Sequence, residues 1–262
     1  MNPNSLSGLT VLITRPSNQV ESMRRAIESE GAKVLSLPLI EIKALNDAQA
    51  IQDLKDKILQ LDSYQALIFV SNNAVSFGGE VINNYWPQFP LGVDVIAVGP
   101  TTAEAASEQF VCEVTQPSNG MTSEDILCLP QLQDVSGQKI GIVRGHGGRE
   151  LLADTLRERG AIVDYLEAYS RSPIDYTSAD FCNRLFEAGV NVLTVSSGES
   201  LDRLTHLLAG NGKMLQQLKL VVPSQRVGRQ AENSGYQQVH NASGADPLSF
   251  VSALGELGIN QE

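Results

Sequence analysis

A strand–helix–strand pattern occurs twice in this chain, and the repetition limits the folds that it can adopt. The first copy begins with the apolar run LTVLI at residue 9, and the second begins with KIGIV at residue 139. In each copy an arginine follows the first strand, an amphipathic helix comes next, and a glycine stops that helix before a second strand. Arg15 and Arg144 are separated by the same number of positions as Gly31 and Gly160. This shared register indicates an internal duplication of a βαβ unit.

Strands and helices are expected to alternate along nearly all of the chain. The apolar runs of strand length are 9–13, 33–37, 65–70, 93–98, 139–143, 162–166, 191–195, 219–222 and 236–239. The expected helices are 17–30, 47–60, 74–84, 149–159, 179–188, 199–208, 227–234 and 247–256. The spacing of Ser71 and Ser196 equals that of Gly99 and Ser224, so the duplication covers most of both halves. Such alternation predicts an α/β fold with two doubly wound, flavodoxin-like lobes, each a parallel sheet with helices on both faces.

The composition and charge of the chain argue against nucleic acid and membranes as partners. A chain of 262 residues with 42% hydrophobic residues can fill two buried cores. The formal net charge of −11 and the lack of any Lys/Arg run argue against binding to nucleic acid. No run is apolar enough to cross a bilayer, no signal-peptide pattern is present, and three scattered cysteines without CxxC spacing are typical of a reducing compartment. We therefore expect a cytoplasmic protein that makes no membrane contact.

Small polar residues follow six of the expected strands. In parallel α/β sheets, ligands collect at the carboxyl ends of the strands, where helix N-termini direct free N–H groups outward. Any one of these strand ends could be an ordinary helix cap, but caps require neither arginines nor paired glycines. The set favours a site for carboxylates or phosphates. Its members are Arg15, Ser71, Asn72, Asn73, Gly99, Thr101, Thr102, Arg144, Gly145, Gly147, Gly148, Arg149, Ser196, Ser197, Gly198, Ser224 and Arg226.

The sequence lacks the well-defined motifs of cofactor-binding, metal-binding and nucleophilic sites. The turn RGHGG resembles part of a dinucleotide-binding loop, but no acidic residue ends the next strand in the required way. His146, His206 and His240 are far apart and lack spaced Cys or carboxylate partners, so we expect no metal. No phosphate-binding loop and no nucleophile elbow occur. The sequence thus predicts a ligand cleft without an obvious catalytic group, with His146 left open as a base.

Several segments, in order, resemble the uroporphyrinogen-III synthase family. These are ITRP with the following helix and GAKV, then PLIEI, FVSNNAV, AVGPTTAEA, RGHGGRELLADTLRERGAIV and the pair Tyr169/Arg171. VSSGES and VPSQRV stand where the family has its second T-S-S-x and G-x-T-A segments. In the latter, Ser224 replaces the glycine, and Arg226 and Val227 occupy positions that are often threonine. The resemblance covers nearly the whole chain.

The resemblance implies a domain arrangement that the residues alone do not. The polar stretch from Thr115 to Gln138 would by itself suggest a boundary between two consecutive lobes. The family instead implies one lobe from residues 1–37 and 173–262 and another from residues 42–167. Two linker strands, residues 38–42 and 166–172, would connect the lobes, with a cleft between them.

The resemblance also implies the reaction. Members of the family cyclise hydroxymethylbilane, a linear tetrapyrrole with eight carboxylates, to uroporphyrinogen III, and they invert ring D on the way to haem and sirohaem. This chain would then be a cofactor-independent lyase and a monomer that acts mainly by holding its substrate in position. Tyr169 is the one candidate for a chemical role, assisting departure of the hydroxyl; packing at the linker is the alternative.

Two other functions fit parts of the pattern. A non-catalytic, two-lobed binder of small anions would share the strand-end residues, but such proteins usually carry a signal peptide. A nucleotide-sugar transferase with two similar lobes would need a phosphate loop and a metal-binding pair of carboxylates.

Overall fold

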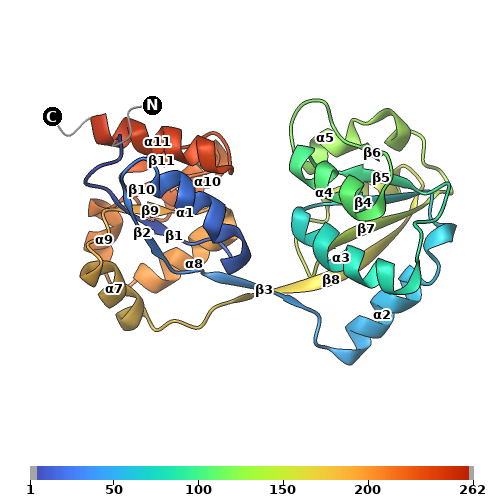
Figure 1. The fold of residues 1–262 in the computed structure, drawn as a ribbon, viewed down its shortest axis with the longest axis horizontal. Coiled ribbons are helices and arrows are strands. Elements are labelled where there is room, and N and C mark those ends of the chain that lie inside the picture. The colour runs from blue at the N-terminus through green and yellow to red at the C-terminus, as the bar shows by residue number, and fades with distance from the viewer. Residues whose placement is uncertain (1–4, 260–262) are drawn as a thin grey trace. The chain divides into compact units, whose positions relative to one another are not determined.

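The computed structural model describes residues 5–259, in which strands and helices alternate along the chain (Figure 1). The strands are β1 Thr10–Ile13, β2 Lys33–Ser36, β3 Ile40–Ala44, β4 Ala66–Phe69, β5 Asp94–Ala97, β6 Val114–Thr115, β7 Lys139–Gly145, β8 Ile162–Pro173, β9 Val192–Thr194, β10 Lys219–Val222 and β11 Val239–Asn241. The helices are α1 Val20–Glu28, α2 Ala48–Ile58, α3 Asn72–Tyr85, α4 Pro100–Phe110, α5 Ser123–Leu127, α6 Leu151–Glu158, α7 Ser178–Glu187, α8 Gly198–Leu208, α9 Gly212–Gln217, α10 Gln225–Asn233 and α11 Pro247–Ile259.

The described residues form two compact units. Those up to Glu41 and those from Ser172 onward make unit 1, and Ile42–Arg171 make unit 2. Unit 1 contains a parallel sheet of order β11-β10-β9-β1-β2. The N-terminal strand β1, blue in Figure 1, therefore lies beside β9 from the C-terminal part of the chain. This strand order is the flavodoxin order, with its switch point between β1 and β9.

Both faces of the unit 1 sheet are covered. Successive strand residues point to opposite faces, so Val11 and Ile13 pack toward α1 and α11, whereas Leu12 packs toward α7, α8 and α10. Phe250 of α11 is buried in the same core as Val11 and Ile13, and Leu201 of α8 is buried in the same core as Leu12. The helices thus bury their apolar stripes against two sides of one parallel sheet, as the sequence predicts.

Unit 2 contains a sheet of order β3-β8-β7-β4-β5-β6, in which the strands from β8 to β6 are parallel. The chain first builds outward from β4 to β5 and β6 and then returns to the other side of β4 as β7 and β8. The switch point lies between β4 and β7, where doubly wound sheets usually bind their ligands. Two doubly wound parallel sheets confirm the predicted fold class.

The polar segment between Thr115 and Gln138 belongs to the body of unit 2. It contains α5, and its apolar residues Ile126, Leu132 and Val135 are buried in the core that covers one face of β4 and β7. A Thr122–Asp125 capping box starts α5. α5 packs against α6.

Some element bounds differ from the predicted ones. The last strand was expected at 236–239, but Tyr236 packs its buried ring beside α8, where the Thr205 hydroxyl donates to its oxygen at 3.3 Å. β11 therefore begins at Val239. The helix expected from residue 149 begins at Leu151, because Gly147 and Gly148 hold positive φ angles of 71° and 111°.

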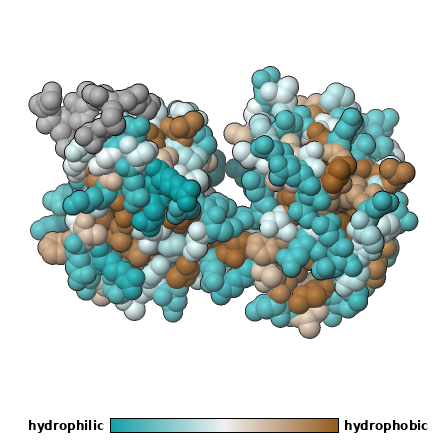
Figure 2. Space-filling model, viewed as in Figure 1, coloured by the Kyte–Doolittle hydropathy of each residue, from teal (hydrophilic) through white to brown (hydrophobic). Residues whose placement is uncertain are grey.

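The surface seen in Figure 2 is mostly hydrophilic on each unit, with apolar residues scattered among polar ones. Within the described part of the chain, no helix combines the length and apolar character needed to cross a bilayer.

Candidate functional site

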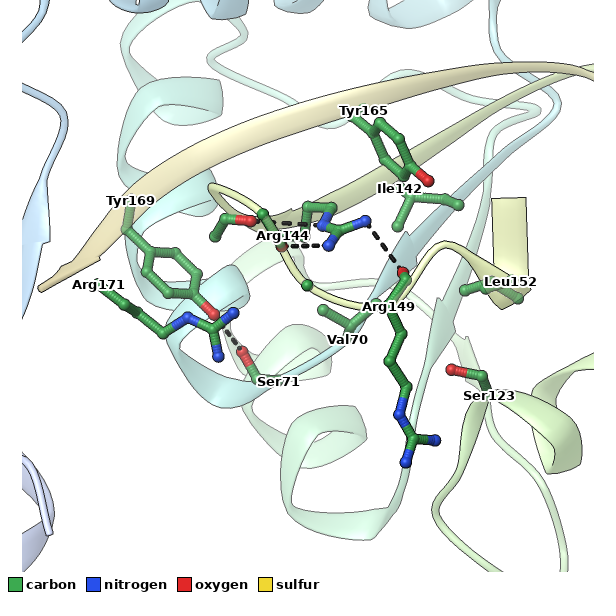
Figure 3. A pocket seen from close by; sticks show the side chains of 13 residues that line it. Val70, Ser71, Ser123, Ile142, Arg144, Arg149, Leu152, Tyr165, Tyr169 and Arg171 are labelled. Carbon is green, nitrogen blue, oxygen red and sulfur yellow. Dashed lines mark hydrogen bonds between the residues drawn. The ribbon is translucent and has the colours of Figure 1, made fainter. Parts of the chain in front are cut away.

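A cavity of about 190 Å³ lies in unit 2 at the carboxyl ends of β4, β7 and β8 (Figure 3). It occupies the switch point of this sheet, next to the first turn of α3. Its lining residues are Val70, Ser71, Ser123, Ile142, Arg144, Gly145, Gly147, Gly148, Arg149, Leu152, Tyr165, Tyr169 and Arg171. Seven of the predicted residues are thereby brought together, namely Ser71, Arg144, Gly145, Gly147, Gly148, Arg149 and Tyr169.

A bulge in β8 aims Tyr169 into this cavity. Arg144 of β7 pairs with Glu167, but the next residue, Gly145, pairs with Tyr169, so Ala168 is an extra residue in the ladder. Regular alternation would place Tyr169 on the face of the sheet opposite Ala168. The bulge instead lets both residues pack in the same core with Phe69. Bulges often redirect a side chain next to an active site.

The ring of Tyr169 is held on both sides. A Cβ atom at Gly145 would lie only 2.5 Å from Tyr169 Cε2, so a glycine is needed for the ring to rest against β7. The Phe77 ring lies 5.5 Å away between centroids, and the backbone N–H of His146 donates to the Tyr169 carbonyl at 2.8 Å. Only 4% of Tyr169 is exposed. Its hydroxyl is therefore presented to the cavity in a fixed position.

Ser71 is the partner of that hydroxyl. Its Oγ caps α3 by accepting from the Ala74 N–H at 3.1 Å, and it lies 3.2 Å from the Tyr169 hydroxyl oxygen (Figure 3). Where Ser71 donates its own proton to Tyr169, the phenol proton is left to point at a ligand. This arrangement can supply a proton or a strong hydrogen bond to an oxygen bound in the cavity.

Positive charge surrounds the cavity. A Cβ atom at Gly148 would lie 2.5 Å from Arg144 Nη2 and 3.4 Å from Arg171 Nη2, so both guanidinium groups approach the same backbone position. The Arg149 side chain is 56% exposed, and its Nη1 is 3.8 Å from the Glu124 carboxylate. With the N-terminus of α3 at the same edge, these groups favour an anionic ligand.

His146 and Glu167 form a second polar pair on the same turn. His146 Nδ1 lies 2.8 Å from Glu167 Oε2, and Glu167 Oε1 accepts from the Gly147 N–H at 3.2 Å. The His146 side chain is 77% exposed. It lies outside the residues that line the cavity.

The ends of β4 and β5 are linked to each other. The Thr102 hydroxyl is buried and donates to Asn72 Oδ1 at 2.8 Å. Gly99 begins α4, and a Cβ atom there would come within 2.7 Å of Met121 Cγ. Asn73 and Thr101 lie in the first turns of α3 and α4. These predicted residues lie on the edge next to the cavity but do not line it.

The predicted residues of unit 1 lie at the carboxyl ends of adjacent strands. Ser197 caps α8 by accepting from the Ser200 N–H at 3.1 Å, and Ser224 caps α10 by accepting from the Val227 N–H at 3.5 Å. Ser196 and Gly198 flank Ser197. Arg226 is exposed on α10 in a surface hollow that also contains Arg229.

Arg15 at the end of β1 is anchored within unit 1. Its guanidinium donates to the Ala245 carbonyl and lies 5.7 Å from the centroid of the Phe250 ring. Burial lowers the pKa of Arg15, and the Asp246 carboxylate opposes that shift. The loop that carries Ala245 and Asp246 was not among the predicted site residues.

Sequence reasoning missed other features of these strand ends. Thr14 and Thr194 are fully buried, and their hydroxyls donate to the Thr194 and Leu12 carbonyls at 2.8 and 2.7 Å, which ties β1 to β9. Arg171, Tyr165 and Ser123 were also not predicted to line a site. The YSR segment was a signal for Arg171, since the arginine follows Tyr169 at a two-residue spacing. Among residues 5–259, no three His, Cys, Asp or Glu side chains are grouped as a metal site would require.

Comparisons with known proteins agree on one family. The family model described as uroporphyrinogen-III synthase HemD matches residues 21–252. Uroporphyrinogen-III synthases of Salmonella typhimurium and Escherichia coli are each 33% identical over 94% of this chain and 100% of their own lengths. A crystal structure of a mutant uroporphyrinogen III synthase from the extremely thermophilic bacterium Thermus thermophilus has a TM-score of 0.65 at 15% identity, over 97% of this chain and 100% of that one. Uroporphyrinogen-III synthetase from Helicobacter pylori has a TM-score of 0.60 at 16% identity, over 97% and 99% of the two chains. These structures share the fold.

Proposed function

Since the chain belongs to the uroporphyrinogen-III synthase family, we propose that it closes hydroxymethylbilane to uroporphyrinogen III with inversion of ring D. The protein is then a cyclising lyase that acts on a linear tetrapyrrole. The observation that supports this proposal best is the family match across residues 21–252, combined with an arginine-rimmed cavity at the switch point of unit 2. A substrate with eight carboxylates suits such a rim.

Tyr169 is the proposed acid. The reaction begins when the hydroxymethyl group loses its oxygen as water, which leaves a reactive azafulvene that can also close without an enzyme to the wrong isomer. The Tyr169 hydroxyl, whose oxygen lies 3.2 Å from Ser71 Oγ, could donate its proton to the departing oxygen. Because the bilane is so reactive, this step needs only modest assistance.

Arg149 and Arg171 are the proposed ligands for a carboxylate in the cavity. Hydrogen bonds between a guanidinium and a carboxylate are stronger than those between neutral groups. A Cβ atom at Gly147 would meet no atom within 4 Å, so the turn leaves room there for an acetate or propionate group to approach. The first N–H groups of α3 would add to the attraction.

The remaining strand-end residues are proposed to hold other carboxylates of the substrate. They are Arg15, Asn72, Asn73, Gly99, Thr101, Thr102, Gly145, Ser196, Ser197, Gly198, Ser224 and Arg226. In this mechanism many contacts fix the conformation of the bilane so that ring D closes in the inverted orientation, which is catalysis by positioning. We further propose that the protein needs no cofactor and acts as a cytoplasmic monomer.

Turnover of freshly prepared hydroxymethylbilane tests the function. The purified protein should give uroporphyrinogen III faster than the spontaneous reaction gives the type I isomer, as measured by chromatography of the oxidised products. Dialysis against a chelator should leave the rate unchanged if no metal is needed. Tight binding of the bilane with only the type I product would instead identify a small-anion binder.

A further inference from the structure

Arg144 differs from the other arginines of the cavity because it is buried. Only 6% of the residue is exposed, whereas 56% of the Arg149 side chain is exposed. A buried guanidinium is stable in a protein when its N–H donors are matched by acceptors. The contacts of Arg144 therefore indicate what it does.

Three donors of Arg144 bind carbonyls of the turn that follows it. Nε donates to the Gly145 carbonyl at 3.3 Å, Nη1 donates to the Arg149 carbonyl at 3.2 Å, and Nη2 donates to the Gly147 carbonyl (Figure 3). These carbonyls surround one planar guanidinium. A lysine has a single nitrogen and cannot reach three acceptors spread in this way.

The other side of the guanidinium is also occupied. Arg144 Cζ lies 4.5 Å from the centroid of the Tyr165 ring, and the Tyr165 hydroxyl donates to Glu150 Oε2. Glu150 Oε1 in turn lies 3.6 Å from Arg144 Nη1. Arg144, Tyr165 and Glu150 thus form a closed set of contacts, which fixes the guanidinium under the turn.

The turn held by Arg144 is the surface against which the proposed catalytic groups rest. Gly145 contacts the Tyr169 ring, since a Cβ atom there would lie 2.5 Å from Cε2. A Cβ atom at Gly148, which has a φ of 111°, would lie 3.4 Å from Arg171 Nη2, so this backbone position also lies close to that guanidinium. A shift of this backbone would move the Tyr169 hydroxyl and the Arg171 guanidinium together.

We propose that Arg144 is a positioning residue, which holds the turn of residues 145–149 so that Tyr169 and Arg171 face the substrate, and that it is not itself a carboxylate ligand. This inference rests on the proposed function, because its kinetic effect is read in the synthesis of uroporphyrinogen III. Misplacement of a catalytic group by about 1 Å can cost on the order of a hundredfold in rate.

Arg144→Lys separates the two roles, because it keeps the charge but loses the planar donor set. Arg144→Lys and Arg144→Gln should both lower kcat on the order of a hundredfold. Any rise in KM that comes from a displaced Arg171 should be the same in the charged and the neutral variant, with the same salt dependence in both. Arg24→Lys, which keeps the charge on α1 where Arg24 pairs with Glu28 at 3.4 Å, is the matched control and should retain activity. In limited proteolysis, trypsin should cleave after Arg149 faster in both Arg144 variants than in the wild type, because the turn opens more often.

Two results would overturn the proposal. Wild-type kcat in Arg144→Lys, together with a salt-sensitive rise of KM in Arg144→Gln, would show that Arg144 is a carboxylate ligand. Unchanged kcat in both variants with only a lower melting temperature would show that it merely stabilises the fold.

If neither Arg144 variant folds, Tyr165→Leu removes the stacking from the other side, and its unchanged kcat and trypsin cleavage would equally contradict the proposal. A wild-type protein without synthase activity would refute the proposed function alone, since the proteolysis still reports on the turn.

Discussion

The hydroxyl oxygens of Ser71 and Tyr169 lie 3.2 Å apart although 98 positions separate the two residues. Ser71 follows β4, Tyr169 belongs to β8, and β7 lies between these strands. The contact reaches across β7 because the bulge turns Tyr169 inward and Gly145 has no side chain to block its ring. The proposed acid therefore depends on three strand ends at once.

Replacement of Tyr169 by phenylalanine tests the acid role. Tyr169→Phe keeps the ring between Gly145 and Phe77 but removes the proton donor, so kcat should fall on the order of a hundredfold. The melting temperature should change little, because one hydrogen bond is worth only about 1 kcal/mol. Turnover to the type III isomer is the measurement. Full activity in this variant would end the acid proposal.

The strand-end hydroxyls should matter less individually than Tyr169. Ser71→Ala, Thr102→Val, Ser197→Ala and Ser224→Ala should each lower kcat/KM by at most about a hundredfold, which is the value of one lost hydrogen bond to a charged group. The three serines cap helices, so their variants should also lose about 1 kcal/mol of stability. Melting curves separate the two effects. An inactive variant with a normal melting curve would contradict the distributed-contact mechanism.

A methyl group at Gly145 should disturb Tyr169 directly. In Gly145→Ala the new Cβ atom would lie 2.5 Å from the ring, so the ring or β7 must move. We expect a loss of kcat and a destabilisation of about 1–3 kcal/mol from overpacking. Gly210→Ala is the control, because no atom lies within 4 Å of the added Cβ there. Equal activity in the two variants would show that the Gly145–Tyr169 contact does not set the rate.

Much of the fold was predictable because buried apolar residues recur at regular intervals along strands and helices. The alternation of Val11, Leu12 and Ile13 between two cores needs only the period of a strand, and the duplication fixes the corresponding elements of the second half. The segment that contains Ile126 and Leu132 was harder to assign to a core. Its apolar residues are few and lie in one short helix and one 3-10 turn. These elements are too short to show a periodic pattern of apolar residues in the sequence.

The site was predictable as a set of strand ends but not as a geometry. Parallel pairing brings Ser71 and the glycine turn to one edge, and that follows from the strands alone. The direction of the Tyr169 side chain depends on the bulge at Ala168, and no pattern in the amino-acid sequence indicates a bulge there. The donors of Arg144 meet carbonyls only because Gly147 and Gly148 adopt positive φ angles. Such contacts depend on tertiary structure and cannot be read from spacing.

The stability of unit 1 should fall at high pH through Tyr236. Burial raises the pKa of this phenol to about 12. A folded-state pKa above the unfolded value of about 10 means that the neutral phenol stabilises the fold fully below pH 10, and that this stability is lost as pH rises toward 12. The loss should reach about 2 kcal/mol. The free energy of unfolding in urea is measured for the wild type and for Tyr236→Phe at pH 8.5 and 11.5. The wild type should lose more stability between these pH values than Tyr236→Phe does. Equal losses in the two proteins would show that Tyr236 makes no such contribution.

Arg149 and Arg171 should determine how substrate binding depends on salt. Both guanidinium groups line the cavity of unit 2, so removing one should raise KM for the bilane and reduce the rise of KM with ionic strength. Attraction between exposed charges is screened over about 10 Å at 0.1 M salt, so the difference from wild type should be largest at low salt. Arg24→Gln removes the same charge from α1, where Arg24 pairs with Glu28 at 3.4 Å, and serves as the control. If Arg149→Gln and Arg171→Gln behave like Arg24→Gln at low salt, the cavity does not hold a carboxylate of the substrate.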